Sequence, residues 1–370
     1  MKVAIVTLHR VYNFGSALQA YATQKFFEML GCETEIIDYI TPQRTKKRIF
    51  FTPAADVNMQ GIRAIAYRFA KVGSLVLKEI TFGGFVRRHL KLTRKYIDDV
   101  DLDANPPKAD MYVTGSDQTW NSHYNERVDR GFWLDFLPVE ARRISFASSF
   151  GKDRLDPKEI KTTKSYLSRY AGISVREDTA RNIVSELGYE AVQLIDPTLL
   201  LSKEEWLKRA SRRLVRERYL ILMLLYNEDN HATEYARKIA DEKGLTLVKI
   251  SWEMKKPHMV DRLMTHRSPE DFLSLFANAD FVVTNSFHGL AFSIKFEKEF
   301  VVVPRNEFYS RIDSLLKLTG LQSRLVNSEE QLRCIREPID YLPIRNVLEL
   351  EKERSIRFVQ EFVKVRNLND

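Results

Sequence analysis

Short apolar runs alternate with longer amphipathic segments along most of the 370-residue chain. The runs are typical of buried strands, and the segments between them carry apolar residues at helical spacing. Strands are predicted over 2–8, 34–38, 111–114, 143–148, 173–175, 192–195, 219–225, 245–250, 281–283 and 300–303. Helices are predicted over 17–30, 157–170, 231–243, 269–277, 290–296, 312–318 and 345–365. Such alternation is typical of α/β proteins with parallel sheets.

The alternation occurs in two series, which predicts two Rossmann-like domains that face one another across a cleft. A charged segment over 201–217 is expected to be a helical connector, and we place the domain boundary within it. The N-terminal domain then covers 1–205 and the C-terminal domain covers 206–370, ending in a long helix. Clefts between domains are favoured ligand sites.

Composition indicates a globular protein, with 44% hydrophobic and 29% charged residues. The two cysteines, Cys32 and Cys334, are too far apart in sequence to suggest a disulfide framework or a metal knuckle. The N-terminus lacks the apolar region of a signal peptide, and the apolar run over 219–226 is far shorter than the roughly 20 residues of a spanning helix. We therefore expect a soluble, cytoplasmic protein.

Positive charge is concentrated in residues 41–95, which contain thirteen Lys and Arg against two acidic residues. The net charge of the chain is +8, so the remainder is slightly acidic. Apolar residues at helical spacing over 62–69 and 75–80 predict a basic helical insertion. It is either a solvated face that covers the domain core or a surface for an anionic membrane or an acidic ligand. No nucleic-acid-binding module accompanies it, so we expect no nucleic-acid partner.

His288 follows the predicted strand 281–283 and the polar turn 284–287, and Gly289 opens the next apolar segment. The sequence thus places His288 at the carboxyl end of a parallel strand and beside a helix N-terminus. Ligands of open α/β sheets bind at such strand ends, and helix N-termini favour anions. The alternative is a core histidine whose ring is satisfied by a backbone carbonyl.

With the His288 turn included, six predicted strands or turns at strand ends carry polar residues. They are Asn13-Phe14-Gly15-Ser16, Gly115-Ser116-Asp117-Gln118-Thr119-Trp120-Asn121, Ser148-Ser149-Phe150-Gly151, Ser174-Val175-Arg176-Glu177, Asp196-Pro197-Thr198 and Asn285-Ser286-Phe287-His288-Gly289. None is a G-x-G-x-x-G, and the first is too short for a P-loop, so dinucleotide binding is not indicated. In their order along the chain and in their residues, these turns resemble the motifs of the polysaccharide pyruvyl transferase family. The resemblance extends from about residue 3 to residue 320.

The resemblance implies a fold like that of GT-B glycosyltransferases. It also implies transfer of a pyruvyl group from phosphoenolpyruvate to a pair of sugar hydroxyls, which gives a cyclic ketal. The hallmark histidine of the family falls on His288, and its strand-end arginine falls on Arg176. Many members have Arg-Leu-His where this chain has Ser286-Phe287-His288, and that arginine contacts the donor. Another cation must therefore take its place, and the nearby candidates are Lys295, Arg305 and Arg311.

Ketal formation needs a proton donor, a proton acceptor and cations for the donor's carboxylate and phosphate. We expect His288 to be the acid and Asp117 the base, although Asp117 could instead cap its own turn. Arg176 would bind the donor, or else form an ion pair with Glu177 or a neighbouring helix. The predicted donor side comprises Arg176, Asn285, Ser286, Gly289, Lys295, Arg305 and Arg311. The predicted acceptor side comprises Asn13, Gly15, Ser16, Gln118, Trp120 and Asn121, where Trp120 either stacks on a sugar or packs in the core.

His123, His258 and His266 are isolated and lack the spacing of metal ligands, so we expect neither a metal nor a cofactor beyond the phosphoenolpyruvate substrate. We expect the acceptor to be a hexose on a lipid-linked intermediate at the inner membrane face. The basic segment would then bind that surface, which would make the chain a peripheral membrane protein. Two alternatives stay open. One is a glycosyltransferase of the same fold that uses a nucleotide sugar, and the other is a non-catalytic glycan-binding protein.

Overall fold

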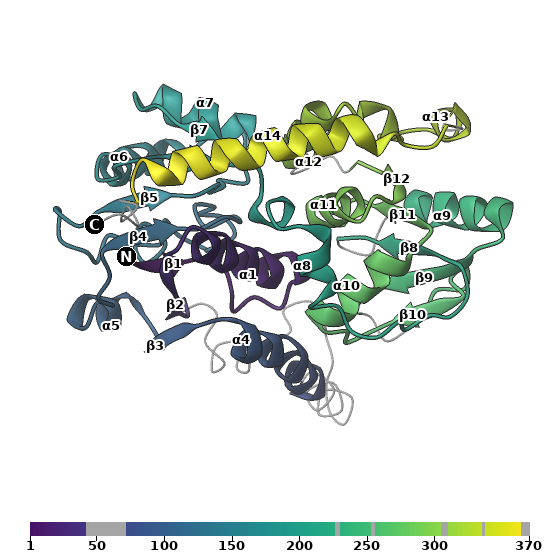
Figure 1. Ribbon diagram of the computed structural model, residues 1–370, viewed down its shortest axis with the longest axis horizontal. Coiled ribbons are helices and arrows are strands. Elements are labelled where there is room, and N and C mark those ends of the chain that lie inside the picture. Colours follow the sequence, from purple (N-terminus) through teal and green to yellow (C-terminus); the bar gives the residue numbers. More distant parts are fainter. Residues whose placement is uncertain (42–71, 226–229, 253–255, 305–309, 335–336, 364–370) are drawn as a thin grey trace. The chain divides into compact units, whose positions relative to one another are not determined.

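The computed structural model describes residues 1–41, 72–225, 230–252, 256–304, 310–334 and 337–363 (Figure 1). The chain forms two compact units. The first comprises Met1–Leu194 with Phe358–Asp370, and the second comprises Ile195–Arg357. The division thus falls before the predicted boundary at residue 205. One reason is that the buried indole of Trp206 packs on Phe292, with 5.3 Å between the ring centroids, and also donates a hydrogen bond to the carbonyl of Thr198 at 3.0 Å, which joins the segment before residue 205 to the second unit.

The first unit is built on a parallel sheet of five strands in the order β3-β2-β1-β4-β5. The strands are β1 (Lys2–Val6), β2 (Glu33–Tyr39), β3 (Leu92–Tyr96), β4 (Met111–Thr114) and β5 (Arg143–Ser145). From Val3 onward every residue of β1 is buried, which explains its continuous apolar run. The strand order reverses between β1 and β4. In open α/β sheets, ligands bind beyond the carboxyl ends of the strands at such a reversal.

α1 (Phe14–Met29) follows β1 directly and begins earlier than the predicted start at residue 17. Asn13 caps it, because its side chain accepts a hydrogen bond from the N–H of Ser16. Phe26 and Phe27 of α1 pack on Phe146, with ring centroids 5.1 and 5.3 Å apart. The further elements of this unit are η2 (Glu79–Gly83), α4 (Gly84–His89), α5 (Asp99–Ala104), α6 (Pro157–Leu167), β6 (Ser174–Val175), α7 (Asp178–Glu186) and β7 (Val192–Gln193).

The expected basic insertion over 41–95 ends earlier than predicted, because its last residues form β3, the edge strand paired with β2. Arg94 and Lys95 of β3 are exposed. Charged side chains suit an edge strand, since they discourage pairing with other chains. The predicted apolar stripe over 62–69 lies outside the described residues.

The second unit repeats the arrangement, with five parallel strands in the order β10-β9-β8-β11-β12. They are β8 (Tyr219–Met223), β9 (Thr246–Ile250), β10 (Arg262–Met264), β11 (Phe281–Thr284) and β12 (Glu299–Val302). The helices that accompany them are α9 (Asn230–Lys243), α10 (Pro269–Asn278), α11 (Phe287–Lys295) and α12 (Ser310–Thr319). β10 falls in a segment that was expected to be irregular, because three partly exposed residues at a sheet edge have no strand-like apolar pattern.

The predicted helical connector over 201–217 is largely wrong, since only α8 (Lys203–Leu207) is an α-helix there. Further along, Arg213 donates hydrogen bonds to the carbonyls of Val215 and Glu217 at 2.7 and 3.3 Å. These carbonyls thus have side-chain partners instead of helical ones. The remaining elements are η3 (Pro197–Leu199), η4 (Gln322–Arg324), α13 (Glu329–Cys334) and α14 (Tyr341–Gln360). Within the described ranges, no helix combines the length and apolar character needed to cross a bilayer.

Candidate active site

His288 lies in the first turn of α11, directly after the polar turn that ends β11. Its side chain is largely enclosed, and the residue is 7% exposed. The ring of Phe287 packs edge-to-face against the imidazole, with 5.1 Å between centroids. The predicted position of His288, at a strand's carboxyl end and a helix N-terminus, is therefore confirmed.

Asp196 is the acidic neighbour of His288. Its Oδ2 lies 3.8 Å from His288 Nε2, and both side chains are buried. Asp196 Oδ1 accepts hydrogen bonds from the N–H and the hydroxyl of Thr198, at 2.9 and 2.7 Å. This cap of η3 fixes the carboxylate with Oδ2 toward the imidazole, where a negative charge attracts an imidazolium. The Asp196 turn is one of the predicted strand-end turns, but Asp196 was not among the predicted site residues.

Ser286, Asn285 and Gly289 hold the turn around His288 in place. Ser286 Oγ accepts a hydrogen bond from the N–H of Gly289 at 3.4 Å and so caps α11. Asn285 Oδ1 accepts one from a backbone N–H beyond the end of β8, at 2.6 Å. A Cβ on Gly289 would lie 2.3 Å from Thr284 Oγ1, so only glycine lets α11 approach β11 this closely. These three predicted donor-side residues therefore position the helix start.

The candidate cations near His288 differ in position. Arg311, buried in α12, places its guanidinium carbon 5.8 Å from the ring centroid of Phe287. Lys295 is in the last turn of α11, about 10 Å along the helix axis from His288, and lines another pocket. Lys295 was expected on the donor side beside His288, but the structure places it at the other end of α11. Arg305 lies outside the described residues.

In the first unit, three predicted site residues from distant segments meet. Ser16 Oγ donates a hydrogen bond to Asp117 Oδ2 at 2.5 Å. Arg176 Nη2 lies 3.9 Å from Asp117 Oδ1, and Arg176 Nη1 donates to Ser116 Oγ at 3.4 Å. All of these side chains are buried. They meet because the three segments follow β1, β4 and β6. These strands run parallel, so their carboxyl ends lie at the same edge.

Asp117 has a φ of +76°, in the left-handed region that most residues avoid. Asp and Asn tolerate this conformation better than other residues because their short side chains bond locally. Here Asp117 Oδ1 accepts from the N–H of Gln118 at 2.9 Å. Asp117 is thus a turn-capping residue and also the acidic neighbour of Arg176. Backbone strain of this kind is concentrated at functional sites.

Glu177 is a second acidic neighbour of Arg176, with 3.7 Å between Glu177 Oε2 and Arg176 Nε. It is fully buried, and its Oε1 accepts from Ser149 Oγ at 2.7 Å. The ion-pair alternative for Arg176 is therefore present in the structure. Both carboxylates lie near the upper limit of ion-pair distance from the guanidinium, which differs from a close bidentate pair.

The predicted acceptor-side residues have different roles: some cap or begin α1, and others form hydrogen bonds within the loop after β4. Asn13 caps α1, and Gly15 is buried in its first turn. Asn121 Nδ2 donates to Gln118 Oε1 at 2.5 Å, and its Oδ1 accepts from the N–H of Tyr124 at 3.0 Å. Asn121 therefore supports the loop after β4, while Gln118 is the half-exposed member of the pair.

Trp120 is a core residue, which corrects its expected role as a sugar platform. It is 3% exposed and stacks on Trp133, with centroids 4.4 Å apart and ring planes 2° from parallel. Phe150 and Tyr170 pack on other sides of the same ring. No face of the indole is left for a ligand.

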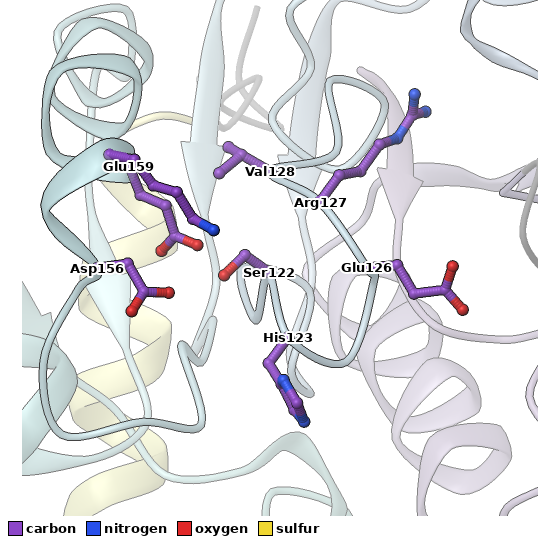
Figure 2. A pocket seen from close by; sticks show the side chains of 8 residues that line it. Ser122, His123, Glu126, Arg127, Val128, Asp156 and Glu159 are labelled. Carbon is purple, nitrogen blue, oxygen red and sulfur yellow. The ribbon is translucent and has the colours of Figure 1, made fainter.

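A pocket of about 580 Å³ lies beyond this loop, and we name it the Ser122 pocket (Figure 2). It is lined by Ser122, His123, Glu126, Arg127, Val128, Asp156, Lys158 and Glu159. Figure 2 shows Asp156 and Glu159 on one side and Glu126 and Arg127 on the other, with Ser122 between them. Lys152 donates hydrogen bonds to Ser122 Oγ at 2.7 Å and to Glu159 Oε2 at 2.6 Å. It therefore links two residues that line the pocket. Only the polar run after Asn121 could have indicated this pocket from sequence.

Metal ligands do not gather in the part of the chain that the structure describes, where no group of three His, Cys, Asp or Glu side chains could hold an ion. The candidate site residues named above are acids, bases and cations. They include the buried His288–Asp196 pair and the buried Arg176, which lies between two carboxylates.

Comparison with solved structures identifies the fold. The UDP-N-acetylglucosamine 2-epimerase of Rickettsia bellii superposes with a TM-score of 0.53 at 11% identity, covering 98% of this chain and 96% of that one. The UDP-GlcNAc 2-epimerase of Methanocaldococcus jannaschii gives 0.52 at 11% identity, covering 98% and 100%. These low identities show the fold alone, which is a GT-B-like α/β fold of two domains. None of the curated proteins compared with the chain matches it.

The family model for polysaccharide pyruvyl transferases matches residues 13–307. This range includes the strand-end turns of both units, from Asn13 to His288 and Gly289. The chain belongs to the polysaccharide pyruvyl transferase family.

Proposed function

We propose that the protein transfers a pyruvyl group from phosphoenolpyruvate to two hydroxyls of one sugar. The sugar belongs to a cell-surface polysaccharide or its lipid-linked precursor, and the product is a cyclic ketal. The observation that carries this proposal is the buried His288–Asp196 pair at the N-terminus of α11, in a chain of this family. A histidine held beside a carboxylate can carry and release a proton near neutral pH.

Phosphoenolpyruvate has a carboxylate and a phosphate, and both require positive partners. The N-terminal end of the α11 dipole favours an anion beside His288. Ser286 is used as the helix cap, so Arg311 takes the place of the arginine that many members carry two residues before the histidine. Arg176 supplies a further guanidinium, which can bind a carboxylate or phosphate bidentately.

The reaction starts with a proton from the His288 imidazolium, which adds to the methylene carbon of the enol. The neighbouring carbon becomes electron-deficient, and a sugar hydroxyl oxygen attacks it while Asp117 takes the hydroxyl proton. The carbon–oxygen bond to phosphate then breaks, and the second hydroxyl closes the ring. The two sugar hydroxyls release one proton each. One of these protons replaces the proton that His288 gave to the methyl group, and the other leaves with phosphate. Each proton transfer contributes a rate factor of about 10²–10⁴.

The Ser122 pocket is the proposed binding region for the sugar acceptor. Its carboxylates, hydroxyl and imidazole are groups that accept or donate hydrogen bonds to sugar hydroxyls, and its volume of about 580 Å³ suits a small saccharide. Glu126 and His123 are exposed at its rim. Substituting these two residues should raise the KM for the acceptor and leave the KM for phosphoenolpyruvate unchanged.

The direct test incubates the purified protein with phosphoenolpyruvate and a panel of lipid-linked and soluble saccharides. We expect phosphate release and a product whose mass increases by one pyruvyl ketal. His288→Ala and Arg176→Ala should each abolish turnover. The matched controls are His258→Ala and Arg181→Ala, which alter exposed residues of the same types in the same units.

Two results would redirect the assignment. Transfer from a nucleotide sugar, with no use of phosphoenolpyruvate, would identify a glycosyltransferase. Saccharide binding without any turnover would identify a glycan-binding protein. Turnover that survives both His288→Ala and Arg176→Ala would overturn the residue assignment.

Membrane association is part of the proposal, because lipid-linked acceptors are carried at a membrane surface. Residues 41–95 supply the positive charge, although the described part is partly neutralised. Arg87 pairs with Glu79 at 3.1 Å, and Lys91 pairs with Glu28 at 2.9 Å. Flotation with anionic vesicles tests this point, and charge reversal of the Lys and Arg in this segment should abolish binding. Unchanged flotation of that variant would refute it.

A further inference from the structure

A second pocket lies at the opposite end of α11 from His288, and we name it the α11–α14 pocket. Its volume is about 270 Å³, and α11, α14 and the η3–α8 segment contribute its walls. Six charged residues line it, namely Lys203, Lys295, Arg345, Lys352, Glu297 and Glu349. The polysaccharide pyruvyl transfer proposed above does not use any of them.

The carboxylates of this pocket are already paired. Glu297 is bonded by Arg345 at 2.5 Å and lies 3.6 Å from Lys203 Nζ. Glu349 pairs with Lys352 at 2.9 Å. Among the described residues, no carboxylate oxygen comes within 4 Å of Lys295 Nζ. The pocket therefore holds four cations against two acids, with Lys295 as the cation that lacks a carboxylate partner.

The surroundings of Lys295 disfavour its own charge. Burial, together with repulsion from the nearby Lys352, lowers the pKa of Lys295 to about 8. The charges of Glu349, Glu204 and Glu297 partly oppose this effect. A bound anion would offset both the loss of solvent and the repulsion from Lys352. Leu200 and Ile344 supply apolar wall beside the cations.

The α11–α14 pocket is separate from the candidate active site on α11. Seven residues separate His288 from Lys295, which corresponds to about 10 Å along the helix. His288 is at the N-terminal end, and Lys295 is in the last turn, just before the C-cap at Phe296. A ligand bound by Lys295 would thus contact α14 and η3–α8 instead of the turn that carries His288.

We propose that the α11–α14 pocket is a second anion-binding site, which takes a small organic phosphate. Lys295 and Lys352 bind the phosphate oxygens, and the apolar wall contacts a short carbon chain. Because α11 and α14 both line the pocket, the ligand joins the end of the helix that carries His288 to the C-terminal helix. The site would therefore regulate the protein or stabilise it without taking part in the chemistry.

The test uses inorganic phosphate as the probe and the full chain carrying His288→Ala, so that phosphate at the proposed active site contributes less. Lysines are acetylated at pH 8 with an N-hydroxysuccinimide ester, and each site is quantified by peptide mass spectrometry. We expect phosphate at about ten times its Kd to slow acetylation of Lys295 about tenfold. Chloride at the same ionic strength should have little effect. Lys317, an exposed lysine of α12 paired with Asp313, is the internal control and should be unaffected.

Thermal unfolding gives a second readout in the same background. Phosphate should raise Tm, and Lys295→Met should remove that increase while Lys317→Met retains it. Lys295→Gln, which keeps a polar end group, serves if the Met variant does not fold. Equal acetylation of Lys295 with phosphate and with chloride would overturn the proposal. A phosphate-induced rise in Tm that persists in both Lys295 variants would overturn it too.

Discussion

Asp196 faces His288 across 3.8 Å, and the other oxygen of its carboxylate is held by Thr198. The two residues are 92 positions apart in sequence, yet both belong to the second unit. The pair combines a carboxylate fixed by a short helical turn with an imidazole fixed by a helix start. Its geometry leads to the first prediction.

Asp196→Asn should lower kcat about tenfold or more, with little change in the KM for phosphoenolpyruvate. The amide keeps the cap to Thr198 but removes the negative charge that attracts the imidazolium, so proton donation suffers more than binding. Steady-state kinetics check this. Thr198→Val is the control, since it removes one hydrogen bond to Oδ1 and leaves the charge, and it should keep most of kcat. Equal losses in the two variants would assign Asp196 a purely structural role.

Asp117→Asn should lower kcat about 10²-fold while the protein keeps its thermal stability. Asn adopts the left-handed backbone that Asp117 shows, so the substitution removes the charge and keeps the turn. Asp117→Ala would alter both. If the Asn variant retains full activity, Asp117 is a turn residue only and another group must accept the hydroxyl proton.

Gly289→Ala should destabilise the protein by about 1–3 kcal/mol and reduce activity, because the new Cβ would meet Thr284 Oγ1 at 2.3 Å. α11 would have to move away from β11 and take His288 with it. Denaturant unfolding and kinetics measure the two effects. Gly73→Ala is the control, since nothing lies within 4 Å of its added Cβ and its backbone is helical, so it should lower neither quantity.

Trp120→Phe should lower stability by about 1–3 kcal/mol and leave the KM for the saccharide acceptor unchanged. The substitution shortens a buried ring that stacks on Trp133 and contacts no open surface. A selective rise in the acceptor KM, with stability retained, would restore the sugar-stacking role expected from sequence.

Asp38→Asn should destabilise the protein at neutral pH by about 3 kcal/mol, because it leaves His9 and Arg10 without their carboxylate. Burial alone would raise the pKa of Asp38, but hydrogen bonds from His9 and Arg10 outweigh it and hold the pKa well below its ordinary value. A carboxyl with a lowered pKa stabilises the fold above its unfolded pKa of about 3.9. That contribution is lost as the pH falls.

The difference in denaturant midpoint between the original protein and Asp38→Asn should therefore be constant from pH 7 to about pH 5 and shrink below about pH 4. Unfolding curves across this range measure it. A difference that stays constant down to pH 3 would mean that the charge of Asp38 does not stabilise the fold.

The periodicity of the chain determined most of the strands and helices, because β1, β8 and β11 are buried on both faces and show as apolar runs. It also determined the position of His288, since a strand followed by a polar turn and an apolar helix places the residue at the start of that helix. The family resemblance, carried by the strand-end turns, was sufficient to assign the family. Short edge elements such as β10 were missed because they bury too little apolar surface to require a run of apolar residues in the sequence.

Tertiary structure alone decided which polar residues meet and which are buried. Nothing local to Trp120 distinguishes a sugar platform from a ring stacked on Trp133, because the partner comes from another segment. Lys295 is near His288 in sequence, but helix geometry places it at the other end of α11. The pairing of Asp196 with His288 likewise depends on contacts between η3 and α11, which no spacing along the chain encodes.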